Sequence, residues 1–280
     1  MDLTTDARFP GLAAELVRAG VGAPGEPPPA IELSRLPEVV QRYLSFMRVG
    51  AEVRDVSFVV GWSGRFRLRP RGRWMPFDAI QYDACMGATR FWRMRLRYAG
   101  VPIVARDTYV RGRGRMVGRV LDRFSVVDAG GPELDTGELV TFLNDAILLA
   151  PSMLLDERTG WSAVDDRAFD VAFSDRGRKV GARVSVNADG AVRDFSTTDR
   201  FVQDPYRRGH PFVRARWSTP IGAWRTVHGR RVPVRGQAVW HLPQGDFVYA
   251  EMSPKLDHLA FETGAAGCRP SRFLGSTGPT

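Results

Sequence analysis

Lysine is almost missing from this 280-residue sequence. Lys179 and Lys255 are the only two lysines among 40 basic residues, so 38 are arginine, and with 31 acidic residues the net charge is +9. An arginine bias of this kind is typical of GC-rich coding sequence and affects the whole chain. The positive charge favours anionic partners at long range but does not by itself indicate nucleic-acid binding. We therefore predict no specific nucleic-acid partner.

Cysteines and long apolar runs are also scarce. Cys85 and Cys268 lie far apart, which excludes a disulfide framework and suits a reducing compartment. Residues 1–20 include Asp2 and Asp6 and no unbroken apolar run, so we expect no signal peptide there. No segment reaches the roughly 18 uncharged apolar residues of a membrane-spanning helix. These observations predict a cytoplasmic protein without a transmembrane segment.

Common catalytic and cofactor motifs are absent as well. Gly61 and Gly64 are one residue too close for the G-x-S-x-G nucleophile motif, and the glycines from Gly112 to Gly118 do not match a dinucleotide fingerprint. We expect the latter to mark a bulge or a crowded crossing of strands. Zinc-binding spacing is not found among the four histidines His210, His228, His241 and His258. The sequence thus predicts no metal, no cofactor and no nucleophilic triad from motifs.

The N-terminal part has the apolar spacing of two helices. Residues 8–19 repeat apolar side chains every three or four positions, and residues 36–47 do so again, with Pro37 in the first turn. The Pro/Gly-rich segment 22–29 between them cannot continue a helix. We therefore predict an amphipathic helix and a linker over residues 1–30, ahead of the main domain.

A third helix is predicted at 137–150. Asp135 and Glu138 have the spacing of a capping box, and Pro151 ends the apolar pattern. Apolar residues occupy nearly all sides of this helix, which is typical of a helix buried on most of its surface.

Most of the remaining chain alternates apolar and polar residues. Residues 65–69 and 92–98 show the period of two that half-buried strands have. Similar runs occur at 74–84, 101–110, 113–121, 168–174, 179–186, 191–200, 212–217, 223–228, 234–241 and 246–252. The predicted fold class is mainly β with minor α: a curved antiparallel sheet or half-barrel meander around one buried helix. Residues 31–262 form one β-rich domain in this interpretation, and 263–280 a disordered tail.

Two carboxylates stand in apolar surroundings. Asp145 lies on the buried helix, where a charge requires an arginine, a hydrogen-bond cluster or a ligand. One alternative is a polar stripe of Glu138, Thr141 and Asp145 that faces solvent or a structural arginine. Asp107 shares a strand face with apolar residues, and we expect a structural ion pair with an arginine such as Arg200. Either carboxylate would alternatively be an acid–base catalyst with a shifted pKa.

Arginines occupy alternate positions of several predicted strands. Arg65 and Arg67 project from one face of their strand, and so do Arg93 and Arg95 from theirs. If these strands are neighbours, one sheet face carries a cationic patch that suits phosphates or another anionic surface. The alternative is a solvated face with interleaved acids.

The stretch from Leu36 to about Phe261 resembles an uncharacterised bacterial family of unknown function. The matching motifs are LPxVxxYL from Leu36, WxPFxAxQ from Trp74, RDxYxxGxGxM from Arg106, GEL before Pro151, and GRxxP followed by Trp240. In the family pattern an Arg-Tyr pair and a Glu occur on the helix, where this chain has Thr141, Phe142 and Asp145, so the carboxylate lacks that arginine. The alternation also resembles the half-barrels of lipoprotein-carrier proteins, which hold acyl chains.

The function predicted from these patterns is binding of a hydrophobic or lipid-like small molecule between the curved sheet and the helix. We expect the following residues to line the cavity: Gln81, Trp92, Met94, Leu96, Asp107, Phe142, Asp145, Arg200 and Trp240. The alternatives are an enzyme that uses Asp145 or Asp107, and a module that makes weak contact with an anionic surface. The anionic-surface candidates are Arg65, Arg67, Arg93 and Arg95.

Overall fold

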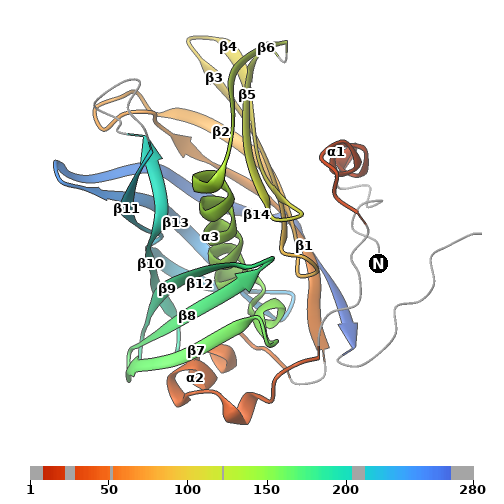
Figure 1. Ribbon diagram of the computed structural model, residues 1–280, viewed down its shortest axis with the longest axis vertical. Coiled ribbons are helices and arrows are strands. Elements are labelled where there is room, and N and C mark those ends of the chain that lie inside the picture. Colours follow the sequence, from red (N-terminus) through yellow and green to blue (C-terminus); the bar gives the residue numbers. More distant parts are fainter. Residues whose placement is uncertain (1–8, 23–28, 51–52, 122, 204–211, 266–280) are drawn as a thin grey trace, which may run out of the picture.

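In the computed structural model, residues 9–22, 29–50, 53–121, 123–203 and 212–265 are described. Within them the chain folds into one curved, open antiparallel sheet of 14 strands around a central helix (Figure 1). The predicted fold class is confirmed. Most of the predicted linker and of the predicted C-terminal tail lies outside the described residues.

The strands follow one another mostly as hairpins. The first half of the sheet contains β1 (Val53–Phe66), β2 (Met75–Ala84), β3 (Thr89–Tyr98), β4 (Val101–Val110), β5 (Arg113–Val120) and β6 (Phe124–Gly130). The second half contains β7 (Thr159–Asp165), β8 (Ala168–Asp175), β9 (Arg178–Val186), β10 (Val192–Gln203), β11 (Phe212–Ser218), β12 (Ile221–Val227), β13 (Arg230–Leu242) and β14 (Gly245–Ala265).

The two halves join where β1 pairs with β14. The order is β6-β5-β4-β3-β2-β1-β14-β13-β11-β10-β9-β8-β7, and β12 pairs with β13 beside this path. Strands β6 and β7 therefore form the two edges, and neither was predicted from the sequence. Strand β14 reaches Ala265, three residues into the segment that we expected to be disordered.

The helix α3 (Pro132–Leu149) fills the concave side of the sheet, where it packs against β4, β5, β9, β10 and β13 (Figure 1). It begins five residues earlier than predicted, because Pro132 fits the first helical position. The capping-box prediction for Asp135 and Glu138 is wrong. Asp135 instead lies in the first turn, and its Oδ1 accepts the backbone N–H of Gly114 at 2.7 Å.

Gly114 allows α3 to approach β5 closely. A Cβ at this position would lie 2.2 Å from the carbonyl oxygen of Leu134, so no larger residue fits without moving the helix. The expected crowded crossing is confirmed here. Asp135 also accepts a hydrogen bond from Arg178 at 3.0 Å, which ties the start of α3 to β9.

Shorter helices close the ends of the core. Helix α2 (Glu38–Phe46) buries Val39, Val40, Tyr43 and Leu44. The Tyr43 hydroxyl donates to the carbonyl of Ile147 at 2.7 Å, which satisfies one of the free carbonyls in the last turn of α3. The short 3-10 helices η2 (Leu33–Arg35) and η3 (Pro151–Leu154) flank these elements.

Helix α1 (Leu12–Arg18) lies on the outer face of the sheet. Phe9, Leu12 and Leu16 form a separate small core with residues of the outer face, among them Tyr82 and Phe91. None of the helices within the described part of the chain combines the length and apolar character needed to cross a membrane.

Candidate functional site

A cavity of about 150 Å³ lies between α3 and the concave face of the sheet. Helix α3 contributes Glu138, Thr141, Asp145 and Leu148, at positions i, i+3, i+7 and i+10 of one helical face. Glu138, Thr141 and Asp145, for which one alternative was a polar stripe that faces solvent or a structural arginine, all border this cavity.

Aromatic side chains form much of the opposite wall. They come from both halves of the sheet: Trp62, Phe66, Phe77, Trp92, Trp217 and Tyr249. The Trp62 and Trp92 rings are 6.0 Å apart, and Phe77 meets Trp92 edge-on at 6.4 Å. Both pairs fall within the separations that aromatic rings prefer in protein interiors.

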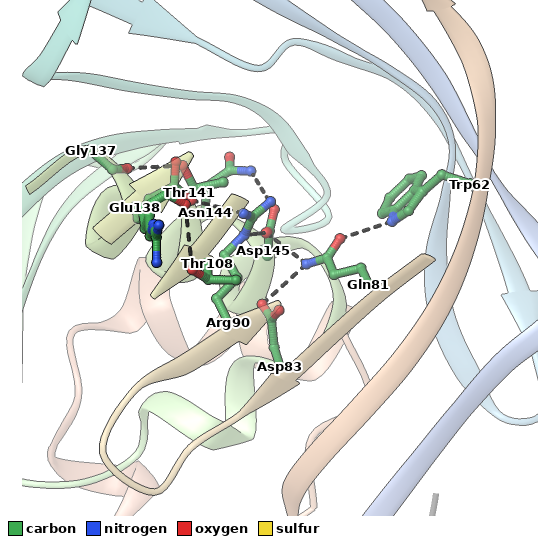
Figure 2. Close-up of polar contacts among 11 residues, drawn as sticks. Trp62, Gln81, Asp83, Arg90, Thr108, Gly137, Glu138, Thr141, Asn144 and Asp145 are labelled. Atoms are coloured by element: carbon green, nitrogen blue, oxygen red, sulfur yellow. Dashed lines mark hydrogen bonds and ion pairs between the residues drawn. The ribbon is translucent and has the colours of Figure 1, made fainter. Parts of the chain in front are cut away.

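A hydrogen-bonded chain connects this wall to the helix. The Trp62 indole N–H donates to Gln81 Oε1 at 2.8 Å, and Gln81 Nε2 donates to Asp145 Oδ2 at 2.7 Å (Figure 2). Gln81 Nε2 also lies 3.1 Å from Asp83 Oδ2. Gln81 is fully buried, and these contacts use its carbonyl and its amide group.

Arg90 of β3 is the cation of this network. Its Nε donates to Asp145 Oδ2 at 2.8 Å, and its Nη1 donates to Glu138 Oε2 at 2.9 Å (Figure 2). Arg90 thus supplies from the sheet the guanidinium that the helix lacks beside Thr141. The expectation that Asp145 meets an arginine and a hydrogen-bond cluster is confirmed.

The acidic side chains around Arg90 outnumber the cations, and their charges shift the pKa values of Asp83 and Arg90. Burial, followed by the charge of Asp145, raises the pKa of Asp83 well above its usual range, although Arg90 opposes this shift. Burial would lower the pKa of Arg90 itself, but Asp145 and Glu138 outweigh it and raise that pKa. Asp83 therefore holds its proton more tightly than a free aspartate does, beside an arginine that is bonded to two other carboxylates.

Asp107 of β4 is half-buried and lines the cavity. Burial, followed by the charge of Glu138, raises the pKa of Asp107 to about 7, while Arg90 and Arg200 act in the opposite direction. Its Oδ1 is buried and accepts no hydrogen bond from the described residues. A carboxyl group of this kind changes its protonation state near neutral pH.

Arg200 of β10 is held by two indole rings. Its guanidinium carbon lies 4.3 Å from the Trp217 ring and 5.6 Å from the Trp240 ring. The predicted ion pair with Asp107 is wrong: both described side chains line the cavity, but no salt bridge joins them. Strands β4 and β10 are not neighbours, because six other strands lie between them in the sheet. Their side chains therefore do not lie side by side.

Six of the nine residues predicted for the ligand site line the cavity, namely Gln81, Trp92, Met94, Asp107, Asp145 and Arg200. The other three do not. Leu96 is buried further along β3, Phe142 packs against Phe173 on another face of α3, and Trp240 stacks on Tyr249 behind the wall.

Arg90 was missed although a signal for it exists. The alternation that directs Trp92 and Met94 toward the helix extends back by two residues to Arg90, which therefore projects to the same side. Trp62 and Tyr249 carry a similar signal on their own strands. Their meeting at one cavity depends on the curvature of the sheet.

The four arginines predicted for an anionic surface have different surroundings. Arg65 pairs with Glu251 at 2.7 Å, Arg67 lies over the Trp74 ring at 4.5 Å, and Arg93 pairs with Glu15 of α1. Arg95 is exposed. They therefore do not form one free cationic face, and their role as an anionic-surface site stays a prediction.

A Ser–His–Asp chain lies on the outer face of the sheet. Ser218 Oγ is 2.9 Å from His241 Nε2, and His241 Nδ1 is 2.7 Å from Asp246 Oδ1. Ser218 is only 2% exposed, whereas the Asp246 side chain is 65% exposed. A nucleophilic triad has the reverse arrangement, with an accessible serine and a buried acid. We interpret the chain as structural.

Among the described residues no group of three His, Cys, Asp or Glu side chains could hold a metal ion. The polar groups of the cavity are the hydrogen-bonded network around Arg90 and two groups of opposite charge, Asp107 and Arg200, that do not bond to each other. The aromatic side chains form the rest of the wall.

Comparisons with known proteins agree with the sequence motifs. Residues 29–252 match the model of a family of unknown function, DUF6544, and the chain belongs to this family. The resemblance inferred from the motifs is confirmed. No curated protein matches the sequence.

Three of the solved structures that match this chain are bacterial proteins. A putative outer membrane lipoprotein-sorting protein domain from Vibrio parahaemolyticus is 8% identical, with 85% of this chain and 96% of that chain covered and a TM-score of 0.40. A DUF1329 family protein from Desulfovibrio piger is 11% identical, with 80% and 92% covered and a TM-score of 0.40. A LolA superfamily protein from Nitrosomonas europaea is 11% identical, with 78% and 90% covered and a TM-score of 0.32.

Proposed function

We propose that the protein binds a small, largely apolar molecule in the cavity and places a neutral polar group of that molecule between Asp107 and Arg200. The observation that carries this proposal is the pair itself: two groups of opposite charge face one apolar cavity and do not bond to each other. A buried polar group without a partner costs free energy, so a ligand that bonds to both is stabilised.

The size of the cavity limits the ligand. Cavities of about 150 Å³ hold a molecule as large as benzene, whereas sites for drug-sized ligands measure roughly 300–1,000 Å³. The ligand is therefore a single ring, a short branched chain, or the end of a longer chain that continues outside. The aromatic wall of Trp62, Phe77 and Trp92 suits a flat ring.

The charges around the cavity favour a neutral polar group. Among the described residues that line the cavity, three are acidic, Asp107, Glu138 and Asp145, and two are cations, Arg90 and Arg200, so a ligand carboxylate would add to an acidic surplus. A hydroxyl or amide offers an acceptor to Arg200 and a donor to Asp107 at the same time.

Binding of four ring compounds tests the proposal. Isothermal titration should give the tightest binding for 4-ethylphenol and weaker binding for ethylbenzene, which lacks the hydroxyl, and for 4-ethylbenzoate, which is charged. Binding of 4-ethylaniline should follow that of the phenol. The Asp107→Asn and Arg200→Gln variants should reduce the preference for phenol over ethylbenzene by roughly tenfold, about the value of one hydrogen bond to a charged group.

The matched control is Arg193→Gln, a change at an exposed arginine on the same strand as Arg200. It should leave all four affinities unchanged. Equal affinity of the wild-type protein for phenol and ethylbenzene would contradict the role of Asp107 and Arg200. Native mass spectrometry of the purified protein should in addition identify a co-purified small molecule.

An acid–base enzyme is the second candidate, and the pKa of about 7 at Asp107 is the observation that favours it. The same ring compounds separate the two functions. A bound compound that is recovered unchanged supports a binding protein, whereas conversion that disappears in Asp107→Asn would show catalysis.

A further inference from the structure

Two neighbouring hairpin turns present exposed apolar side chains. The β3–β4 turn carries Tyr98 and Val101, and the β5–β6 turn carries Leu121 and Phe124, with Val126 next along β6. Phe124 is 65% exposed, Val126 59% and Tyr98 55%. We call these five residues the apolar tip. Both turns lie at the same end of the sheet (Figure 1).

The backbone holds the two turns together. The N–H of Leu121 donates to the carbonyl of Pro102 at 3.0 Å, so the β5–β6 turn lies directly beside the β3–β4 turn. Single exposed apolar residues are normal on a protein surface, but a contiguous group of large ones indicates an interaction site. The apolar tip contains five of the 11 exposed large hydrophobic residues of the described chain.

Exposed arginines surround the apolar tip. They are Arg95 and Arg97 on β3, Arg119 on β5 and Arg123 in the turn, and none has an ion-pair partner among the described residues. The exposed acid on this part of the described surface, Asp128, is already paired with Arg115 at 2.8 Å. Among the described residues, the tip is therefore apolar at its centre and cationic at its rim.

We propose that the apolar tip inserts into the surface of an anionic lipid bilayer, with the surrounding arginines at the phosphate groups. Aromatic and aliphatic side chains at a turn reach the acyl boundary, and arginine binds the headgroups above it. A second copy of the chain fits less well. An interface between two tips would bring two sets of like charges together, which is unfavourable.

The tip is connected to the cavity by one face of β3. Met94 lines the cavity, and Leu96 and Tyr98 follow on the same side of the strand. Four residues of a strand span about 13 Å, so the bilayer surface would lie close to the cavity. An apolar ligand could then pass between the membrane and the cavity, and this part of the inference rests on the proposed function. Docking of the tip to the bilayer does not depend on that function.

Vesicle co-sedimentation of the full chain tests the inference. The protein should bind phosphatidylcholine vesicles that contain phosphatidylglycerol, bind pure phosphatidylcholine far less, and lose binding as salt screens the charges. The double variant Leu121→Ser/Phe124→Ser should bind the anionic vesicles roughly a hundredfold more weakly, since two large side chains no longer enter the bilayer. Replacing Arg97, Arg119 and Arg123 by Gln should cost roughly fivefold for each arginine.

Matched controls use exposed residues of the same kinds elsewhere. Val164→Ser/Val213→Ser and Arg193→Gln/Arg225→Gln should bind vesicles like the wild type. All tip variants should keep the affinity for 4-ethylphenol in solution, which separates docking from the proposed ligand site and shows that they fold.

Three outcomes would overturn the inference. These are absence of binding to anionic vesicles, equal loss of binding in the control variants, and a dimer in solution that disappears in Leu121→Ser/Phe124→Ser without any effect of vesicles. The last outcome would assign the tip to contacts between copies of the chain.

Discussion

Replacement of Arg90 by methionine should be among the most destabilising changes at the cavity. Arg90 is 5% exposed and bonds to Asp145 and Glu138 at 2.8 and 2.9 Å. Arg90→Met keeps the length of the side chain but leaves two buried carboxylates without their cation. Breaking a buried pair in this way costs about 3–5 kcal/mol in the free energy of unfolding, and here one cation serves two acids.

The change at Asp145 should be milder. Asp145→Asn removes hydrogen bonds to a charged group, at a cost of about 1.5–3 kcal/mol, but Arg90 keeps its bond to Glu138. The substitution also relieves the repulsion between Asp145 and Asp83 that raises the pKa of Asp83. The expected order of destabilisation is therefore Arg90→Met above Asp145→Asn.

Urea denaturation at pH 7 measures both values. The control Arg183→Met removes one side of an exposed pair with Asp170 and should leave the unfolding midpoint unchanged. At pH 4 the penalty of Arg90→Met should shrink, because carboxylates without a cation take up protons more readily in the folded state. A cost for Arg90→Met no larger than that for Asp145→Asn at pH 7, or a cost independent of pH, would refute the reasoning.

Three further predictions concern single positions. Because the pKa of Asp83 is raised on folding, its contribution to stability is present below the unfolded pKa near 3.9 and is lost as pH rises; Asp83→Asn should therefore stabilise the protein more at pH 8 than at pH 4 in thermal melts. Gly114→Ala should cost about 1–3 kcal/mol in urea denaturation, because its Cβ meets the Leu134 carbonyl, whereas Gly160→Ala, with open space around it, should be nearly neutral. Titration of 4-ethylphenol should show affinity rising with pH through about 7, as ionised Asp107 becomes the stronger acceptor, and the rise should be absent in Asp107→Asn.

Alternation of apolar and polar residues was sufficient to predict most of the sheet. Strand β8 buries every second residue, and such strands follow directly from the pattern. Strands β6 and β7 were missed because edge strands bury little: all seven residues of β6 except Ala129 are exposed. The start of α3 was placed five residues too late because Pro132 and Glu133 precede the apolar stripe on which the prediction relied.

Prediction of the site was limited by distances across the sheet. The alternation of side chains along β3 directs Trp92 and Met94 toward the helix, and the alternation along β4 directs Asp107 there. It does not give the distance between strands that are not neighbours. The Asp107–Arg200 ion pair was predicted from opposite charge alone, and the two side chains line one cavity without forming it. The prediction that Phe142 lines the cavity failed for a related reason. A helix that is buried on nearly all sides gives no signal for which of its faces borders the cavity.

The Arg90 network has a consequence at Asp107 that stability alone does not explain. Buried ion pairs are often no more stable than apolar residues of the same volume, so burial of Arg90 with Glu138 and Asp145 does not require a gain for the fold. Arg90 is, however, ion-paired with Glu138 at 2.9 Å, and the negative charge of Glu138 is the second cause, after burial, of the raised pKa of Asp107, which the charge of Arg90 opposes. The network thereby sets the protonation of a group that contacts the ligand in our proposal. In Glu138→Gln the pKa of Asp107 should fall, and the pH dependence of 4-ethylphenol binding should move to lower pH with it.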